Sequence, residues 1–280
     1  MINWYLLISA ILVWSIVYLL DRETDSINRQ LDAREIFKYL GTIFCIALFI
    51  VSIVGIILSL LVPNDGTITY VCAVIIIGLL VLLCYIQESK KEQARRAKLF
   101  AWAELHGWSY DYDRDCRSSY LSFFDRLDRG SNRYIFDVLR GKWGRYSADA
   151  FNFHYEIEWD DKSSTTEHHF GVVLIYLDKA FFNLKIKPRD ILSFGGIQFE
   201  LIEFNKKFKV ASNETRFAYD FCHPRLIEYL LEQKNIDLEL KENVLALFID
   251  CDRLVVEDIE YSLDRLIHIR ELMPNYLYRS

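Results

Sequence analysis

The chain has 280 residues, 52% of them hydrophobic, and a formal net charge of −6 at pH 7. The excess of acid lies in residues 99–280, which carry 31 acidic against 24 basic side chains. Binding to nucleic acid depends on clustered cations, so this balance argues against that class of partner, and we predict no nucleic-acid partner.

The first 98 residues contain three long runs without any Asp, Glu, Lys or Arg, at about residues 2–20, 39–62 and 69–87. Roughly 20 apolar residues are enough for a helix to cross a bilayer, and only a helix satisfies its own backbone groups in lipid. The sequence therefore predicts three transmembrane helices. A cleaved signal peptide is the alternative for the first run, but no basic segment precedes it and no small-residue cleavage site follows it.

Lysine and arginine near the ends of the runs predict how the chain is oriented. One basic group separates the first two runs and a second follows the third, and cations near helix ends mark the cytoplasmic side. We expect a multi-pass protein of the cytoplasmic (inner) membrane, with the N-terminus outside and the C-terminal domain in the cytoplasm. The second basic group is predicted to contact lipid headgroups, at about 1 kcal/mol per cation. It consists of Lys90, Lys91, Arg95, Arg96 and Lys98.

Residues 88–106 lack Pro and Gly and place apolar residues at helical spacing, so we expect the third run to continue as one helix. Gly107 suits a C-terminal cap, and Leu99, Trp102 and Leu105 are predicted to dock on the following domain. The expected organisation is a membrane anchor with a basic stalk at 1–98 and a cytoplasmic domain at 99–280.

Beyond Trp108 the hydrophobic pattern has period two, which is typical of strands. Two later segments carry the helical period, and a hairpin is predicted around Glu242 and Asn243. Strands followed by helices favour an α+β domain with an antiparallel meander and two C-terminal helices. The expected strands are residues 134–140, 151–159, 169–177, 182–187 and 197–204, and the expected helices are 224–233 and 257–273.

Three short stretches resemble the signature of an uncharacterised family of bacterial membrane proteins. They are EFNKKFKV at 203–210, RFAY at 216–219 and PRLIE at 224–228, with AWAELHGWSY at 101–110 as a weaker match. The resemblance covers about the last two thirds of the chain. It implies a short membrane anchor with a cytoplasmic domain of unknown function, and it implies no activity.

The same residues also suit a purely structural role. Phe204, Phe208 and Val210 would share one face of an extended segment, and 216–221 would form a short aromatic turn.

A pair of histidines carries the most specific chemistry. His169 is expected across a hairpin from either His154 or Glu156, depending on the register. Two imidazoles and a carboxylate on one face could hold zinc, so His154, Glu156 and His169 are the candidate metal ligands. The alternative is an ordinary exposed His/Glu pair, because no familiar zinc-binding spacing is present.

Other catalytic motifs are weak. The six cysteines show no CxxC spacing, which suits a reducing compartment. Cys222 and His223 are adjacent, but the expected roles are a core thiol and a helix cap, not a thiolate with its base. No phosphate-binding or dinucleotide-binding motif is present, and we predict no cofactor.

These features favour a membrane-anchored cytoplasmic interaction, sensor or scaffold protein without catalytic activity. The lipid bilayer and an unknown protein are the expected partners, and homo-oligomerisation through the stalk remains open. The absence of ionisable residues within the three runs disfavours a transporter. The alternative is a membrane-tethered hydrolase or metal-dependent enzyme that uses the His/Glu face of the hairpin.

Overall fold

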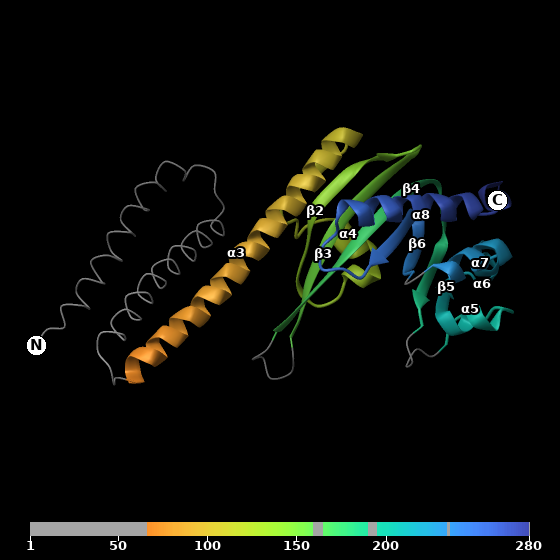
Figure 1. Cartoon of the computed structure of the whole chain (residues 1–280). Helices are drawn as coiled ribbons and strands as arrows, with labels where there is room; N and C mark the ends of the chain where they lie inside the picture. Colours follow the sequence, from red (N-terminus) through yellow and green to blue (C-terminus); the bar gives the residue numbers. More distant parts are fainter. Residues whose placement is uncertain (1–65, 159–164, 190–194, 234–235, 280) are drawn as a thin grey trace, which may run out of the picture. The chain divides into compact units, whose positions relative to one another are not determined.

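The computed structural model describes residues 66–158, 165–189, 195–233 and 236–279 (Figure 1). The chain divides into two compact units, Met1–Ala94 and Arg95–Ser280. The predicted boundary after Lys98 falls just inside the second unit.

The predicted spans at 2–20 and 39–62 lie outside the described residues. The third, at 69–87, falls in helix α3 (Gly66–His106). For residues 69–87 the structure describes the backbone but few of the side chains. Within the part of the chain that is described, no helix is both long and apolar enough to cross a membrane.

The second unit contains an antiparallel sheet and several helices, as the α+β prediction requires. Strands β1 to β5 follow one another in order across the sheet, so β1 to β4 form the predicted meander, while β6 pairs with β4. The described strands are β1 (Ser109–Asp111), β2 (Ser131–Trp143), β3 (Tyr146–Glu158), β4 (Thr165–Pro188), β5 (Phe208–Ser212) and β6 (Leu238–Ile249).

Strand β6 turns back on itself near Glu242, whose φ of 52° lies in the left-handed region. The backbone N–H of Phe248 donates to the carbonyl oxygen of Asp237 at 2.9 Å, so the two ends of β6 lie side by side. The two halves pair with separate parts of β4 across a register shift. This geometry agrees with the predicted hairpin at Glu242 and Asn243.

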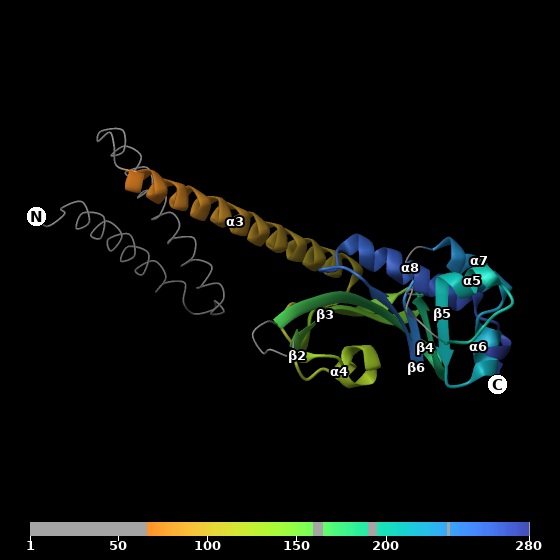
Figure 2. The same ribbon diagram turned by 90° about the horizontal axis from the view of Figure 1, so that it is seen from below.

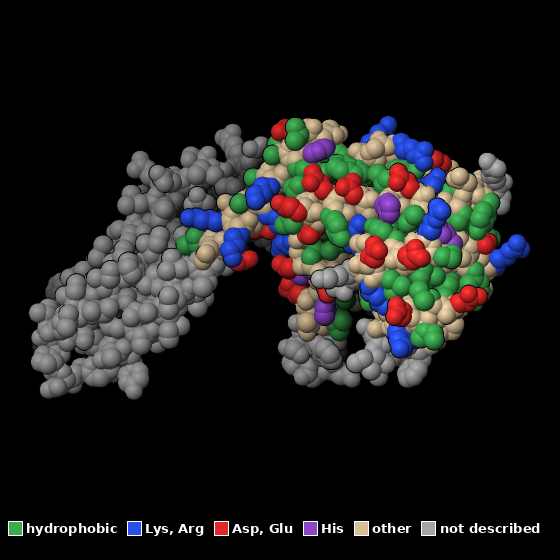
Figure 3. All heavy atoms as spheres, turned by 45° about the vertical axis from the view of Figure 1, so that its right-hand side comes forward, with side chains coloured by type: hydrophobic (Ala, Val, Ile, Leu, Met, Phe, Trp, Pro, Cys, Tyr) green, Lys and Arg blue, Asp and Glu red, His purple; other side chains and the backbone are tan. Residues whose placement is uncertain are grey.

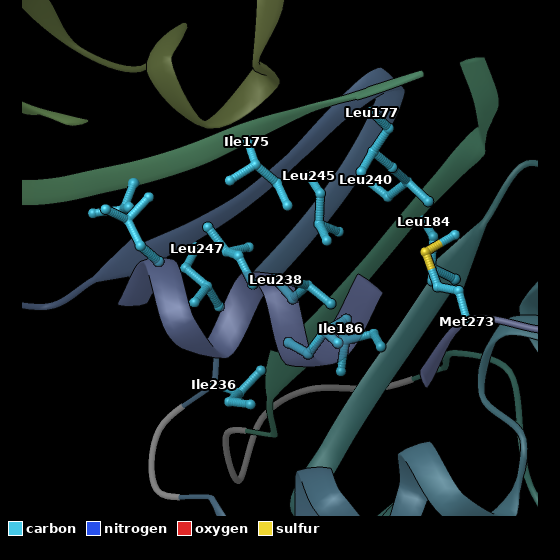
Figure 4. Packing of buried hydrophobic residues seen from close by; sticks show 14 of the residues in the cluster. Ile175, Leu177, Leu184, Ile186, Ile236, Leu238, Leu240, Leu245, Leu247 and Met273 are labelled. Atoms are coloured by element: carbon cyan, nitrogen blue, oxygen red, sulfur yellow. The ribbon is translucent and has the colours of Figure 1, made fainter. Parts of the chain in front are cut away.

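One face of the sheet packs against α8 (Val256–Leu272) and the last turns of α3, and we call it the α8 face. Alternate residues of β4 and β6 point to this side and form a leucine-rich layer (Figure 4). From α3, Leu99 and Trp102 are buried, as predicted, together with Ala103. Leu105 is 82% exposed, so its predicted docking is wrong, because helical spacing from Leu99 selects positions three and four residues on.

The opposite face, the α4 face, is covered by α4 (Tyr120–Phe123) and the 3-10 helix η1 (Asp125–Leu127). Figure 2 shows α8 and α4 on opposite sides of the strands. Aromatic rings dominate this layer, among them the fully buried Phe124, Phe151 and Phe153. Both elements are too short to show a helical period, which is why the sequence did not reveal them.

The remaining helices are α5 (Ile202–Lys207), α6 (Thr215–Phe221), α7 (Pro224–Glu232) and α9 (Tyr276–Arg279). His223 occupies the N-cap position of α7, as expected for the residue before Pro224, although its side chain makes no capping hydrogen bond. The helices predicted at 224–233 and 257–273 correspond to α7 and α8. Residues 216–221, expected as a turn, belong to helix α6.

The strand predicted at 197–204 is wrong. Ile197 forms one isolated bridge with Val210, and Phe204 lies in α5 instead of an extended segment. The reason is local: the Asn205 side chain accepts a hydrogen bond from the Phe199 N–H (2.9 Å) and donates to the Phe199 carbonyl (2.6 Å). These bonds close the chain into a turn that leads directly into the helix.

Candidate functional site

His154 and His169 lie directly opposite each other on β3 and β4. This is one of the two registers that the sequence allowed, and it brings the ring centroids to 4.7 Å. Regular pairing of β3 with β4 places the two residues opposite each other on one face of the sheet.

The carboxylate that joins the two histidines is Glu167. One ligand atom from each of His154, Glu167 and His169 can be chosen so that all lie within 4.8 Å of one another. Glu156, the predicted third ligand, sits opposite Glu167. Its Oε1 accepts a hydrogen bond from Asn132 at 2.5 Å and lies 3.4 Å from His154 Nε2. Glu167 was missed although it alternates with His169 and therefore shares its face.

The two imidazoles have unused binding capacity. His154 is only 2% exposed and stacks on Tyr134, with the ring centroids 4.4 Å apart. Its Nδ1 and the Nδ1 of His169 are buried and have no hydrogen-bond partner among the described residues. Burial, followed by the nearby His154, lowers the pKa of His169, which favours the neutral imidazole that binds metals.

Two histidines and one carboxylate form a ligand set known from catalytic zinc sites, in which a fourth position stays open. Ligand atoms around tetrahedral zinc lie roughly 3.3 Å apart, so binding requires the three groups to close in slightly. Glu167 is exposed and can rotate, whereas His154 is buried and His169 is half-buried. Glu156 beside His154 Nε2 is placed to orient that ring, as carboxylates commonly do behind histidine ligands.

A buried carboxylate, Asp137, lies at a register shift of β2 and has a φ of 51°. It is 1% exposed and accepts hydrogen bonds from Arg95, from the Tyr110 hydroxyl at 2.9 Å and from Asn152 at 3.2 Å. The Arg96 Nε lies 3.5 Å from its second oxygen. Burial and the adjacent Asp137 charge raise the pKa of Tyr110.

The same network extends to the chain before α8. Arg95 donates to the Leu254 carbonyl at 2.8 Å, and the Leu254 N–H donates to Asn152 at 2.8 Å. Asn152 is two residues from His154 on β3, so the Asp137 network and the histidine pair share one side of that strand.

The structure separates the five cations that were predicted to contact lipid. Lys90, Lys91 and Lys98 are exposed, and for them headgroup contact stays a prediction. The Arg95 side chain is only 11% exposed and pairs with Asp137, as does Arg96 at longer range. For Arg95 this differs from the prediction, because a buried carboxylate competes for the guanidinium that the sequence assigned to headgroups.

Cys222 and His223 do not form a catalytic pair. Cys222 is buried, and burial raises the pKa of its thiol. The His223 Nε2 lies 2.7 Å from the Leu272 carbonyl oxygen. Both placements match the expected core thiol and helix cap.

No family model matches the chain, and no curated protein matches it. Among solved structures, the chain is similar to the crystal structure of the mycobacterial trehalose monomycolate transport factor A, TtfA. The TM-score is 0.43 and the sequence identity is 14%, over 66% of this chain and 94% of that chain. Similarity of this extent leaves the site to be interpreted from its own residues.

Proposed function

We propose that this chain is a multi-pass protein of the cytoplasmic membrane whose α+β domain acts in the cytoplasm as an interaction, sensor or scaffold module without catalytic activity. The three uncharged runs and the two basic segments support the anchor and its orientation. The signature at 203–228 supports membership of the uncharacterised bacterial family that it resembles. The expected partners are the bilayer, an unknown protein and, through the stalk, further copies of the chain.

The observation that carries this proposal is the buried attachment of α3 through Arg95. A buried ion pair contributes little net stability, because desolvating both charges costs about as much as their attraction returns. What it provides is one defined position, since moving Arg95 would leave the buried Asp137 with only the more distant Arg96 as a countercharge. A domain that binds or senses a partner benefits from one defined position of the helix end that leads into it, and Arg95 supplies this within the second unit.

The orientation can be tested with Cys116, the exposed member of the described cysteines. Cys222 is buried, and burial raises the pKa of Cys251 to about 11, so both react slowly with maleimides. In intact cells, a membrane-impermeant maleimide should leave Cys116 unmodified until the cells are lysed, as read by peptide mass mapping. An Asn3→Cys variant, expected outside, should be modified without lysis. Modification of Cys116 in intact cells would overturn the proposed orientation.

A second candidate function is metal-dependent hydrolysis, and the convergence of His154, Glu167 and His169 favours it. A zinc ion held by three protein ligands activates a bound water as a nucleophile near neutral pH. Metal analysis by plasma mass spectrometry tests this candidate, on the full chain purified without a histidine tag or chelator.

About one zinc per chain is expected if the site is used. The metal should be lost in His169→Ala. It should be retained in His168→Ala, because the His168 ring stacks on Tyr155 and is not part of the site. Metal-free protein, or equal loss in both variants, would leave the non-catalytic proposal alone.

A further inference from the structure

A second polar site lies where η1, the end of β4, β6 and α8 meet. It is a cavity of about 770 Å³, within the range of small-molecule binding sites. Its lining shares no residue with the histidine pair or the Asp137 network.

Four cations from three parts of the chain line this cavity: Arg126 and Arg129 from η1 and the residues after it, Lys187 from β4, and Arg265 from α8. Like charges around one hollow repel each other. Burial, followed by nearby Arg126, lowers the pKa of Lys187, and burial with nearby Arg129 lowers that of Arg126. An anion in the cavity would remove this repulsion.

The acidic residues of the cavity are largely engaged. Asp237 pairs with Arg126, and Asp258 accepts a hydrogen bond from the Val255 N–H (3.3 Å) at the start of α8. The side chains of Lys187 and Arg129 line the cavity and have no side-chain hydrogen bond or ion pair with any other described residue, although the Lys187 backbone pairs with β5. Asp250, the third acidic residue of the lining, is exposed, so four cations face three carboxylates and the cavity keeps one cation in excess.

Arg265 points to the kind of anion. Its Nε and Nη2 atoms are buried and have no hydrogen-bond partner within the described chain, while its guanidinium lies 5.0 Å from the ring of Tyr261. Buried N–H groups without an acceptor are costly, and a planar guanidinium suits two oxygens of one phosphate. Among the described residues, Asp237 also has one buried oxygen, Oδ1, without a hydrogen-bond partner, and this oxygen can accept a hydrogen bond from a ligand hydroxyl.

We propose that this cavity binds a small molecule that carries a phosphate group, held by Arg265, Lys187 and Arg129, with a hydroxyl donated to Asp237. A phosphate dianion supplies the negative charge that the cations lack. Free inorganic phosphate carries the same anionic group but has no sugar-like hydroxyls. Comparing the affinities of inorganic phosphate and a sugar phosphate therefore distinguishes the two ligands.

Calorimetric titration of the full chain in detergent and phosphate-free buffer tests the proposal. Ribose 5-phosphate should bind at one saturable site, ribose should not bind, and inorganic phosphate should compete more weakly than ribose 5-phosphate. Tighter binding of inorganic phosphate than of the sugar phosphate would support an anion site but contradict the proposed hydrogen bond from a ligand hydroxyl to Asp237. No saturable binding of either phosphate at millimolar concentration would overturn the proposal.

Lys187→Ala should weaken binding of ribose 5-phosphate about tenfold, since it removes one charge-assisted hydrogen bond. Lys206→Ala removes an exposed lysine outside the cavity and should leave binding unchanged. Circular dichroism checks that both variants are folded. Unchanged binding in Lys187→Ala, or equal weakening in both variants, would contradict the assignment.

Discussion

Asp137 joins groups from three separate parts of the chain: Arg95 of α3, Tyr110 of β1 and Asn152 of β3. Its side chain reaches them because the register shift of β2 interrupts the alternation of the strand. Ile135 packs in the α4 layer, whereas Leu139 packs in the α8 layer, although regular alternation would place both on one face. The bulge thus turns one carboxylate toward the arginines.

Replacing Asp137 with Ala should lower the free energy of unfolding by about 3–5 kcal/mol, because the largely buried Arg95 would lose its countercharge. Asp137→Asn removes the charge but keeps a side chain that tolerates positive φ. The stability lost in this variant therefore measures the effect of the charge separately from backbone strain. Glu104→Ala changes an exposed residue of α3 and should alter stability by less than about 0.5 kcal/mol. Urea unfolding of the full chain, followed by tryptophan fluorescence, measures all three. If Asp137→Ala changed stability as little as Glu104→Ala, the network would be dispensable.

Asp125 should make stability depend on pH at the acidic end. Its hydrogen bond and ion pair with Lys185 (2.6 Å), and then Lys241 (3.3 Å), lower its pKa. A carboxyl group whose folded pKa is lowered adds stability above its unfolded pKa, roughly 3.9, and loses it as the pH falls through the folded value. The side chain is 71% exposed, so the effect should be within about 0.2–1 kcal/mol and should weaken in salt.

Unfolding midpoints at pH 5 and pH 3 test this for the wild type and Asp125→Asn. The wild type should lose more stability on acidification than the variant, while Asp113→Asn, an exposed control, should behave as the wild type does. An identical pH response in Asp125→Asn and the wild type would contradict a stabilising role for the Asp125 pairs.

The site could be predicted from the sequence where strand period and turn position decide it. His154 and His169 follow from alternation on either side of a polar turn. Glu167 follows from the same register, and only the choice of Glu156 obscured it. Arg95 could not be assigned, because its partner depends on a bulge that the sequence pattern does not encode.

At the scale of elements, the turn of β6 carries strain that the sequence does not relieve. Glu242 adopts φ 52° although a residue with a Cβ atom is disfavoured there by about 1–2 kcal/mol. Glu242→Gly should therefore raise the free energy of unfolding by about 1 kcal/mol, after the greater flexibility of glycine in the unfolded chain is counted. Glu242→Ala keeps the Cβ atom and should be nearly neutral. Equal effects of the two substitutions in urea unfolding would show that the backbone at this turn is not strained.

Long, periodic elements could be predicted, and short ones could not. The two C-terminal helices and the β3–β4 pairing follow from apolar spacing that a buried face enforces. The segment at 197–204 is apolar in alternation, yet the Asn205 side chain closes it into a turn before α5. The helices α4 and η1 cover the mixed aromatic and aliphatic layer of the α4 face, but they have too few residues to show any period.

At the scale of the whole chain, the surface in Figure 3 mixes acidic, basic and hydrophobic side chains over one face of the molecule. Large exposed apolar residues such as Leu105, Ile202 and Tyr261 come from different elements. Function is therefore better sought in the polar sites than in a broad apolar surface. The second unit begins at Arg95, so one of its polar sites, the Asp137 network, includes its first residue.

A fragment comprising residues 95–280 should fold cooperatively, and a fragment comprising 99–280 should be less stable by about 3–5 kcal/mol, because Asp137 then lacks Arg95 and Arg96. Arg95→Ala in the longer fragment should reproduce most of the loss, which separates the ion pair from the shortening of α3. Asp137→Asn should restore part of the stability of the shorter fragment, since a neutral amide needs no opposite charge. Urea unfolding of the four proteins, followed by tryptophan fluorescence, makes the comparison. Equal stability of the two unmodified fragments would mean that the domain core is complete without the end of α3, and the fixed attachment on which the proposed function depends would then be lost.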